Sequence, residues 1–122
     1  MRAVWVYISG PMTKPDILAN TGQGIAIFNR LLDRNTWDPG AFKGIYIVPI
    51  CPHLSSFAHM TRPRPHAEWI AYDLCVIERC DAVLRLPGES VGADAEVKKA
   101  TAMGKPVFAD WGDLMVWLKS ME

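Results

Sequence analysis

Short runs of apolar residues alternate along this chain with longer stretches in which apolar residues recur at helical spacing. The short runs are bounded by turn residues and predict buried strands at residues 2–8, 45–50, 82–86 and 106–109. The longer stretches predict helices at residues 24–34, 66–80, 92–103 and 111–121. Strands and helices therefore alternate, which is typical of an α/β domain.

A helical segment separates each successive pair of predicted strands, so the strands are expected to be parallel. We expect one flavodoxin-like (Rossmann-like), three-layer α/β domain over residues 1–122, with strand order 2-1-3-4 and the first strand central. Ligands of such sheets bind at the carboxyl ends of the strands. The turn Ser9-Gly10-Pro11 and the loop from Gly88 to Gly92 should meet at that edge.

Three further segments have weaker patterns. Thr21 and Gly22 disfavour a helix, so the first helix is predicted to begin only near Gly24. Residues 37–44 contain the Asp, Pro and Gly residues that favour turns, and residues 51–65 are irregular and rich in proline. This last segment leaves the same edge of the sheet, and it is either a lid over a pocket or a solvated surface loop.

The composition narrows the class of ligand. Thirteen basic and thirteen acidic residues among 122 give a formal net charge of zero. No block of like charge is present, which argues against binding to nucleic acid or a membrane surface through a broad basic face. The apolar runs are far shorter than the roughly 20 residues of a membrane span, and the first ten residues lack a signal-peptide core. We therefore expect a cytoplasmic protein with a small-molecule ligand.

Cysteine and histidine usage gives little sign of a metal. Three cysteines, an odd number, do not make a disulfide framework, so reduced and buried thiols are expected. The residues that could bind a metal are Cys51, His53, His59 and His66, but their spacing matches no usual zinc pattern. We predict neither a metal nor a cofactor.

An acid lies on the packing face of the third predicted helix. At 100° per residue, Glu96 shares its side of the helix with Ala93 and Ala100. A buried carboxylate is costly unless something uses it. In one interpretation Glu96 is a nucleophile or base facing a pocket, and Ser90 and the amides near Gly92 bind an anion at the helix N-terminus. In the other, Glu96 favours the helix dipole and returns a capping hydrogen bond.

A second acid has a similar position in predicted helix 66–80. Asp73 lies within the apolar stripe of that helix, which consists of Trp69, Ile70, Val76 and Ile77. Such surroundings should raise its pKa, which suits a proton donor. The alternative is a structural aspartate that bonds to a backbone amide or a neighbouring hydroxyl.

Five motifs, taken in order, resemble the nucleoside 2-deoxyribosyltransferase superfamily, in particular its short phage and bacterial members. They are VYISGP at 6–11, the helix of Asp73, CDAVL at 80–84, SVGADAE at 90–96 and GKPV at 104–107. The most specific part is the loop and helix that end in Glu96, followed by GKPV. The resemblance implies that Glu96 is the nucleophile, that Tyr7 orients it and that Asp73 lies near the sugar and the departing base.

One departure from the family concerns the 5′ end of the substrate. Six residues before the nucleophile the transferases carry an aspartate that holds the sugar 5′-hydroxyl, whereas this chain has Ser90. A serine there is similar to the 2′-deoxynucleoside 5′-monophosphate N-glycosidases, which use it on the 5′-phosphate. The family also places C-terminal residues of a neighbouring subunit in the site, so the resemblance implies a homo-oligomer.

The function implied by the resemblance is cleavage or transfer of the N-glycosidic bond of a 2′-deoxynucleoside or its 5′-monophosphate, through a glycosyl ester on Glu96. The substrate is expected to contact the residues at the sheet edge, namely Ser9, Gly10, Gly88, Ser90 and Gly92. Two alternatives belong to other classes. One is a nucleotide-binding or sensing module without turnover, and the other is a structural or partner-binding protein, suggested by the five tryptophans.

Overall fold

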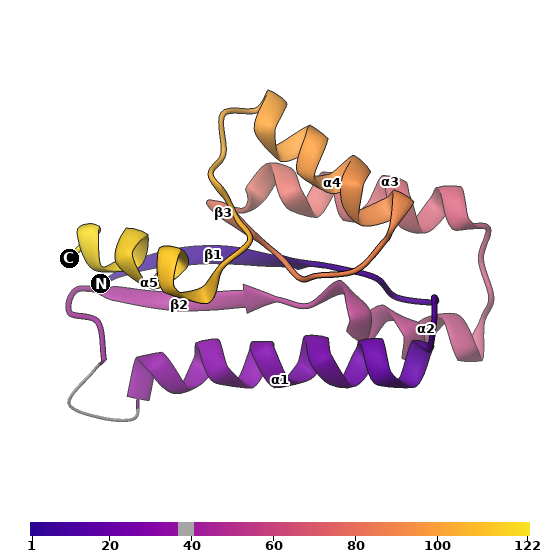
Figure 1. The fold of residues 1–122 in the computed structure, drawn as a ribbon, viewed down its shortest axis with the longest axis horizontal. Helices are drawn as coiled ribbons and strands as arrows, with labels where there is room; N and C mark the ends of the chain where they lie inside the picture. Colours follow the sequence, from indigo (N-terminus) through magenta and orange to yellow (C-terminus); the bar gives the residue numbers. More distant parts are fainter. Residues whose placement is uncertain (37–40) are drawn as a thin grey trace.

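Four parallel strands form the centre of the protein in a computed structural model that describes residues 1–36 and 41–122. The strands are β1 (Arg2–Ser9), β2 (Ile45–Ile50), β3 (Ala82–Arg85) and β4 (Val107–Phe108). Their order is β2-β1-β3-β4 (Figure 1). The predicted parallel sheet, its order and the central position of β1 are thus confirmed. The predicted turn at residues 37–44 lies partly outside the described residues.

Helices cover both faces of this sheet, which makes the three-layer arrangement of flavodoxin-like folds. The main helices are α1 (Ile17–Thr36), α3 (His66–Arg79), α4 (Val91–Ala102) and α5 (Trp111–Ser120). Figure 1 shows α3 and α4 together on the side of the sheet opposite to α1. None of the helices in the described ranges is both long and apolar enough to cross a membrane.

The side chains of β1 alternate between two apolar cores. One core joins β1 to α1 and α5 through Val4, Val6, Ile8, Leu31, Leu114 and Leu118. The other joins β1 and β3 to α3 and α4 through Tyr7, Val83, Ile77 and Ala100. Tyr7 and Ser9 therefore face α3 and α4, which carry the two acids identified in the sequence.

The first helix begins earlier than predicted. α1 starts at Ile17, because Asp16 Oδ1 accepts hydrogen bonds from the amides of Leu18 (2.9 Å) and Ala19 (3.4 Å). Gly24 has a packing role within α1, since a Cβ built on it would lie 2.8 Å from the imidazole of His53. Tertiary packing thus overrides the poor helix propensity of this segment.

The predicted irregular loop over residues 51–65 is wrong for its central part. Pro52–Leu54 forms the short 3-10 helix η1, and Ser55–Thr61 forms α2. Serine hydroxyls stabilise these turns, as Ser55 Oγ donates to the Pro52 carbonyl (2.6 Å) and Ser56 Oγ donates to the His53 carbonyl. The imidazole of His53 is buried, and its Nε2 donates to the carbonyl of Pro11 (3.1 Å).

One smaller expectation also needs correction. Cys75 is exposed, although Cys51 and Cys80 are buried free thiols as expected. A shallow groove of about 250 Å³ lies on the α3 side of the sheet, and its lining includes Trp5, Ile50, Tyr72 and Cys75. This groove is apolar and is lined by neither of the two predicted catalytic acids, so it is distinct from the candidate site.

Candidate active site

Glu96 lies in the second turn of α4 and faces the sheet. The buried face of this helix consists of Ala93, Glu96 and Ala100, as the helical spacing predicted. The side chain of Glu96 is only 8% exposed. Ser90 caps the helix, and its Oγ accepts a hydrogen bond from the amide of Ala93 at 3.0 Å. The cap fixes where α4 begins, and thereby which turn carries Glu96.

Both carboxylate oxygens of Glu96 accept hydrogen bonds from β1. Tyr7 Oη donates to Oε2, and Ser9 Oγ donates to Oε1 at 2.9 Å. Tyr7 and Ser9 are two residues apart on one strand, so they point to the same face of the sheet. The alternative in which Glu96 returns a capping hydrogen bond is wrong, because Ala93 occupies the third helical position after the cap.

The burial of Glu96 and the groups around it act on its pKa in opposite directions. Burial raises the pKa, whereas the hydrogen bonds from Tyr7 and Ser9 and the positive charge of Arg85 lower it. The pKa of Tyr7 is raised strongly by burial and then by the charges of Glu96 and Asp73. The phenol therefore stays protonated and donates to the carboxylate throughout the physiological range.

Asp73 lies on α3 and faces the same region. It is 8% exposed, and its Oδ1 is buried without a hydrogen-bond partner among the described residues. Burial, together with the charge of Glu96, raises its pKa to about 7. A structural aspartate would accept a bond from a backbone amide or a hydroxyl at its buried oxygen, and Oδ1 of Asp73 has no such donor, so the geometry favours the proton-donor interpretation.

The two acids differ in what surrounds them. Glu96 receives two hydrogen bonds, and the positive charge of Arg85 also favours its ionised form. The pKa of Asp73, by contrast, is raised by burial and by the charge of Glu96. Environments that push the pKa values of two neighbouring acids apart assign them the roles of base and acid. Burial raises the pKa of both acids above the ordinary value, but of the two only Glu96 also has hydrogen bonds and a positive charge that favour its ionised form. This asymmetry favours Glu96 as the base and Asp73 as the acid.

We expect Asp73 to titrate near pH 7 in the folded protein, because its carboxyl group is desolvated beside a second acid. Carboxyl-carbon NMR of protein labelled at aspartate would follow this titration, with Asp73→Asn used to assign the signal. A midpoint for Asp73 at or below the value of roughly 3.9 for a free side chain would contradict the buried geometry.

The loops beside the two acids pack closely on one another. A Cβ on Gly10 would lie 3.0 Å from the Cβ of Leu86. Gly88 has a φ of 115°, which favours glycine, and a Cβ there would lie 2.8 Å from the ring of Pro11. The predicted binding residues Gly10 and Gly88 therefore lie in two touching loops after β1 and β3. A Cβ on Gly92 would lie 3.9 Å from Ser90 Oγ, an ordinary contact, and Ser90 is partly exposed.

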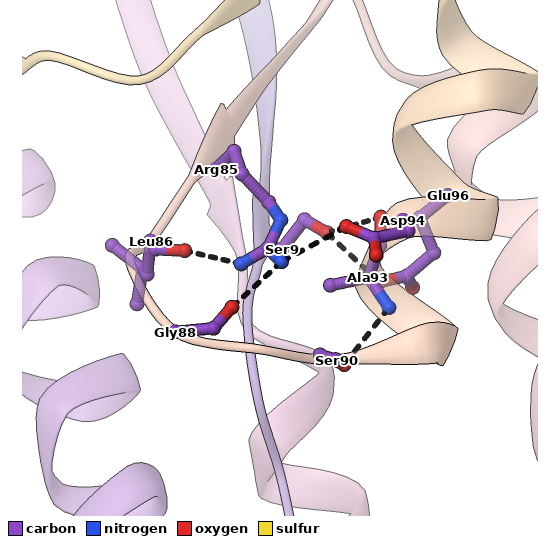
Figure 2. Close-up of polar contacts among 8 residues, drawn as sticks. All are labelled: Ser9, Arg85, Leu86, Gly88, Ser90, Ala93, Asp94 and Glu96. Carbon is purple, nitrogen blue, oxygen red and sulfur yellow. Dashed lines mark hydrogen bonds and ion pairs between the residues drawn. The ribbon is translucent and has the colours of Figure 1, made fainter.

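Arg85 is a site residue that the sequence interpretation missed. Its guanidinium donates to the carbonyls of Leu86 and Gly88, the latter at 2.9 Å, and pairs with Asp94 Oδ1 at 3.1 Å. Figure 2 shows these contacts next to the hydrogen bond between Ser9 and Glu96. The alternation of β3 could have identified Arg85, because it is two residues after Val83 and so faces α4 as well.

In the described residues, no histidine or cysteine hydrogen-bonds to Glu96 or Asp73, although Cys80 packs in the same core as Tyr7. His59 Nδ1 accepts a hydrogen bond from Trp69 Nε1 at 2.8 Å, and His53 bonds to Pro11. Within residues 1–36 and 41–122, no group of three or more His, Cys, Asp and Glu side chains is placed to hold a metal ion. The polar side chains that meet at the site are the carboxyl groups of Glu96 and Asp73, the hydroxyls of Tyr7 and Ser9, and the guanidinium of Arg85.

Fold and site together define a parallel α/β protein with two unlike buried carboxyl groups near the carboxyl edge of its sheet. No protein-family model, curated protein or solved structure matches the chain. The hydrogen bonds of Glu96 and the unpaired oxygen of Asp73 are consequently the observations on which a function can be based.

Proposed function

We propose that the protein is an N-glycosidase or deoxyribosyltransferase that acts on a 2′-deoxynucleoside or its 5′-monophosphate. The observation that carries the proposal is the asymmetric pair of acids. Glu96 is oriented by Tyr7 and Ser9, and Asp73 is buried nearby with an unpaired oxygen. A carboxylate that attacks and an acid that protonates are the two groups that cleavage of a glycosidic bond requires.

In the first step, Glu96 attacks C1′ of the sugar and forms a glycosyl ester. The bond between C1′ and the base nitrogen breaks, its electron pair goes to the base, and Asp73 donates the proton that neutralises the departing base. In the second step, ionised Asp73 accepts a proton from water or from a second base, which attacks C1′ and releases Glu96. Tyr7 and Ser9 keep the carboxylate of Glu96 oriented in both steps.

The 5′ end of the substrate is proposed to carry a phosphate near Ser90. The Oγ of Ser90 accepts from the amide of Ala93, so its hydroxyl hydrogen is available to donate to a phosphate oxygen. The N-terminus of α4 adds free amides and the positive end of the helix dipole. The serine at position 90 is also similar to the serine of the 2′-deoxynucleoside 5′-monophosphate N-glycosidases, which supports a 5′-monophosphate as the substrate.

The experiment that tests the function is incubation with a panel of nucleosides and 5′-monophosphates, followed by chromatographic detection of free base. Release of base from a 2′-deoxy substrate by wild type, and its loss in Glu96→Gln, would support the proposal. Nucleotide binding without release of base, unchanged in Glu96→Gln, would instead favour a sensing module. Assembly into a homo-oligomer and a cytoplasmic location stay predictions.

Ser90→Asp should lower kcat/KM for the monophosphate at least about tenfold and spare the nucleoside. The reason is that a carboxylate repels a phosphate dianion, while each charge-assisted hydrogen bond that it replaces contributes roughly 1.5–3 kcal/mol. Aspartate caps helices as well as serine does, so the fold should be retained. Measuring kcat/KM for both substrates in wild type, Ser90→Asp and the neutral capping variant Ser90→Asn checks this.

A preference of wild type for the nucleoside, or equal losses for both substrates in Ser90→Asp, would show that Ser90 is only a helix cap. The Asn variant separates charge from shape, because it caps the helix and adds no negative charge.

A further inference from the structure

Arg85 ends β3 directly beside the residue that holds Glu96. In the sheet register the Cα of Arg85 pairs with that of Ser9, and Ser9 Oγ donates to Glu96 at 2.9 Å. The side chain of Arg85 is largely buried, with 16% of its surface exposed. A buried guanidinium at the end of a strand needs partners, and it finds them in the loop that follows and in the first turn of α4.

The contacts of Arg85 connect three parts of the site. Two donors hold the carbonyls of Leu86 and Gly88, and a third contact reaches Asp94, two residues before Glu96 (Figure 2). Asp94 is 74% exposed and is screened by water, so it neutralises the guanidinium only in part. The remaining positive charge lies on the same face of the sheet as Glu96.

We infer that Arg85 is a positioning residue, which clamps the loop from Leu86 to Ser90 onto α4 and presents a positive charge to the carboxylate of Glu96. The inference rests on the proposed function for the role of Glu96 as nucleophile. The clamp keeps the loop beside the sugar in one conformation, and the charge favours the ionised form of Glu96 against the effects of burial and of the second acid.

The other groups that face Glu96 do not duplicate this charge. From β1 come the phenol of Tyr7 and the hydroxyl of Ser9, which donate hydrogen bonds but are neutral. From α3 comes Asp73, whose ionised form would oppose a second negative charge. Of the described side chains that act on the pKa of Glu96, Arg85 is the one that carries a positive charge.

Carboxyl-carbon NMR titration of Glu96 tests the inference without any substrate. In Arg85→Gln the midpoint of Glu96 should rise by at least about 0.5 pH relative to wild type, since an adjacent cation favours the charged form. The matched control is Lys98→Gln, which removes an equal charge from the exposed face of the same helix and should shift the midpoint by less than half as much. An unchanged midpoint in folded Arg85→Gln, or an equal shift in Lys98→Gln, would overturn the inference.

Arg85→Lys separates charge from clamp. Lysine keeps the positive charge but lacks the planar fork that donates to two carbonyls. The midpoint of Glu96 should therefore stay within about 0.3 pH of wild type, while amide hydrogen exchange of Leu86 and Ala93, which donate to the Ser9 carbonyl and to Ser90 Oγ, becomes faster. Slow exchange at these amides in Arg85→Lys would refute the clamp.

A second pair of variants keeps the test decisive if Arg85→Gln does not fold. Asp94→Asn frees the guanidinium from its exposed partner, so the midpoint of Glu96 should fall. Glu89→Gln removes the same charge from the same region at an exposed residue and should change the midpoint less. Equal shifts of the Glu96 midpoint in Asp94→Asn and Glu89→Gln would show that the charge of Arg85 does not act on Glu96.

The two proposals can fail separately. If wild type releases no base but Arg85→Gln still shifts Glu96, the proposed function is wrong and the role of Arg85 in setting the charge of Glu96 stands. If base is released and the midpoint does not move, the role of Arg85 is wrong and the function stands. In an active protein, the acid limb of kcat/KM should move upward together with the NMR midpoint in Arg85→Gln.

Discussion

Replacement of Glu96 by glutamine is expected to lower kcat/KM for base release at least about 10²-fold. Glutamine has nearly the same shape as glutamate, so the fold and the hydrogen bond from Tyr7 should persist, but its neutral amide cannot attack C1′. Losses of this size are expected when a covalent catalyst loses its nucleophile. The measurement is initial-rate kinetics with chromatographic detection of the base, next to circular dichroism to verify folding.

Glu89→Gln is the matched control for this result. Glu89 is exposed in the loop before α4, and its substitution makes the same chemical change without touching the buried carboxylate. With the unphosphorylated nucleoside as substrate, for which charge beside Ser90 has little effect, the control should retain wild-type activity. Near-wild-type release of base by Glu96→Gln would remove Glu96 from the mechanism.

Asp73→Asn is expected to cause the second large change in activity. It should lower activity but raise stability at alkaline pH. Asparagine cannot protonate the departing base, so kcat/KM should fall about 10²-fold or more. In wild type, activity should decline as the pH rises through about 7, because the acid then loses its proton. The variant should lack this decline, which a pH profile of kcat/KM would show.

The same substitution should stabilise the protein at alkaline pH. The pKa of Asp73 is raised from 3.8 to about 7 by folding, so the folded state keeps a proton that the unfolded state releases. Stability from this group is fully present below about pH 4 and is lost as the pH rises through about 7. At roughly 1.4 kcal/mol per pH unit the loss is at most about 4 kcal/mol, and asparagine avoids it.

Urea denaturation of wild type and Asp73→Asn at pH 4 and pH 8 shows which of the two proteins is more stable at each pH. The free energy of unfolding of the variant should exceed that of wild type at pH 8, by on the order of 1–3 kcal/mol, and the difference should shrink at pH 4. A variant that is less stable than wild type at pH 8 would mean that the carboxylate of Asp73 has partners that stabilise it in solution.

The fold was largely predictable because short apolar runs and helical spacing are local signals. Strands at Ile45–Ile50 and Val107–Phe108 follow from them, and crossover rules then leave few arrangements of the sheet. The early start of α1 and the helix α2 were not predictable in this way. Local capping by Asp16 and by the hydroxyls of Ser55 and Ser56 supports these turns, and α1 also depends on a distant contact, the packing of Gly24 on His53.

The candidate site was predictable where a side chain violated the pattern of its element. Glu96 and Asp73 stood out because each is an acid on an apolar face, and the structure places both on the same side of the sheet. Arg85 did not stand out, because a single charge at the end of a strand is common. Its importance depends on the register that pairs it with Ser9, which becomes visible only once the strands are assembled.

A row of tight contacts connects α1 to the rim of the site. Gly24 abuts the imidazole of His53, His53 holds the carbonyl of Pro11, and the ring of Pro11 lies against Gly88. A side chain at position 24 would displace the imidazole, and with it the wall on which the loop before α4 rests. Under the proposed function, substitution of Gly24, on the opposite face of the sheet, is expected to change which substrates enter, so a library aimed at altered specificity should include Gly24 as well as the residues around Glu96.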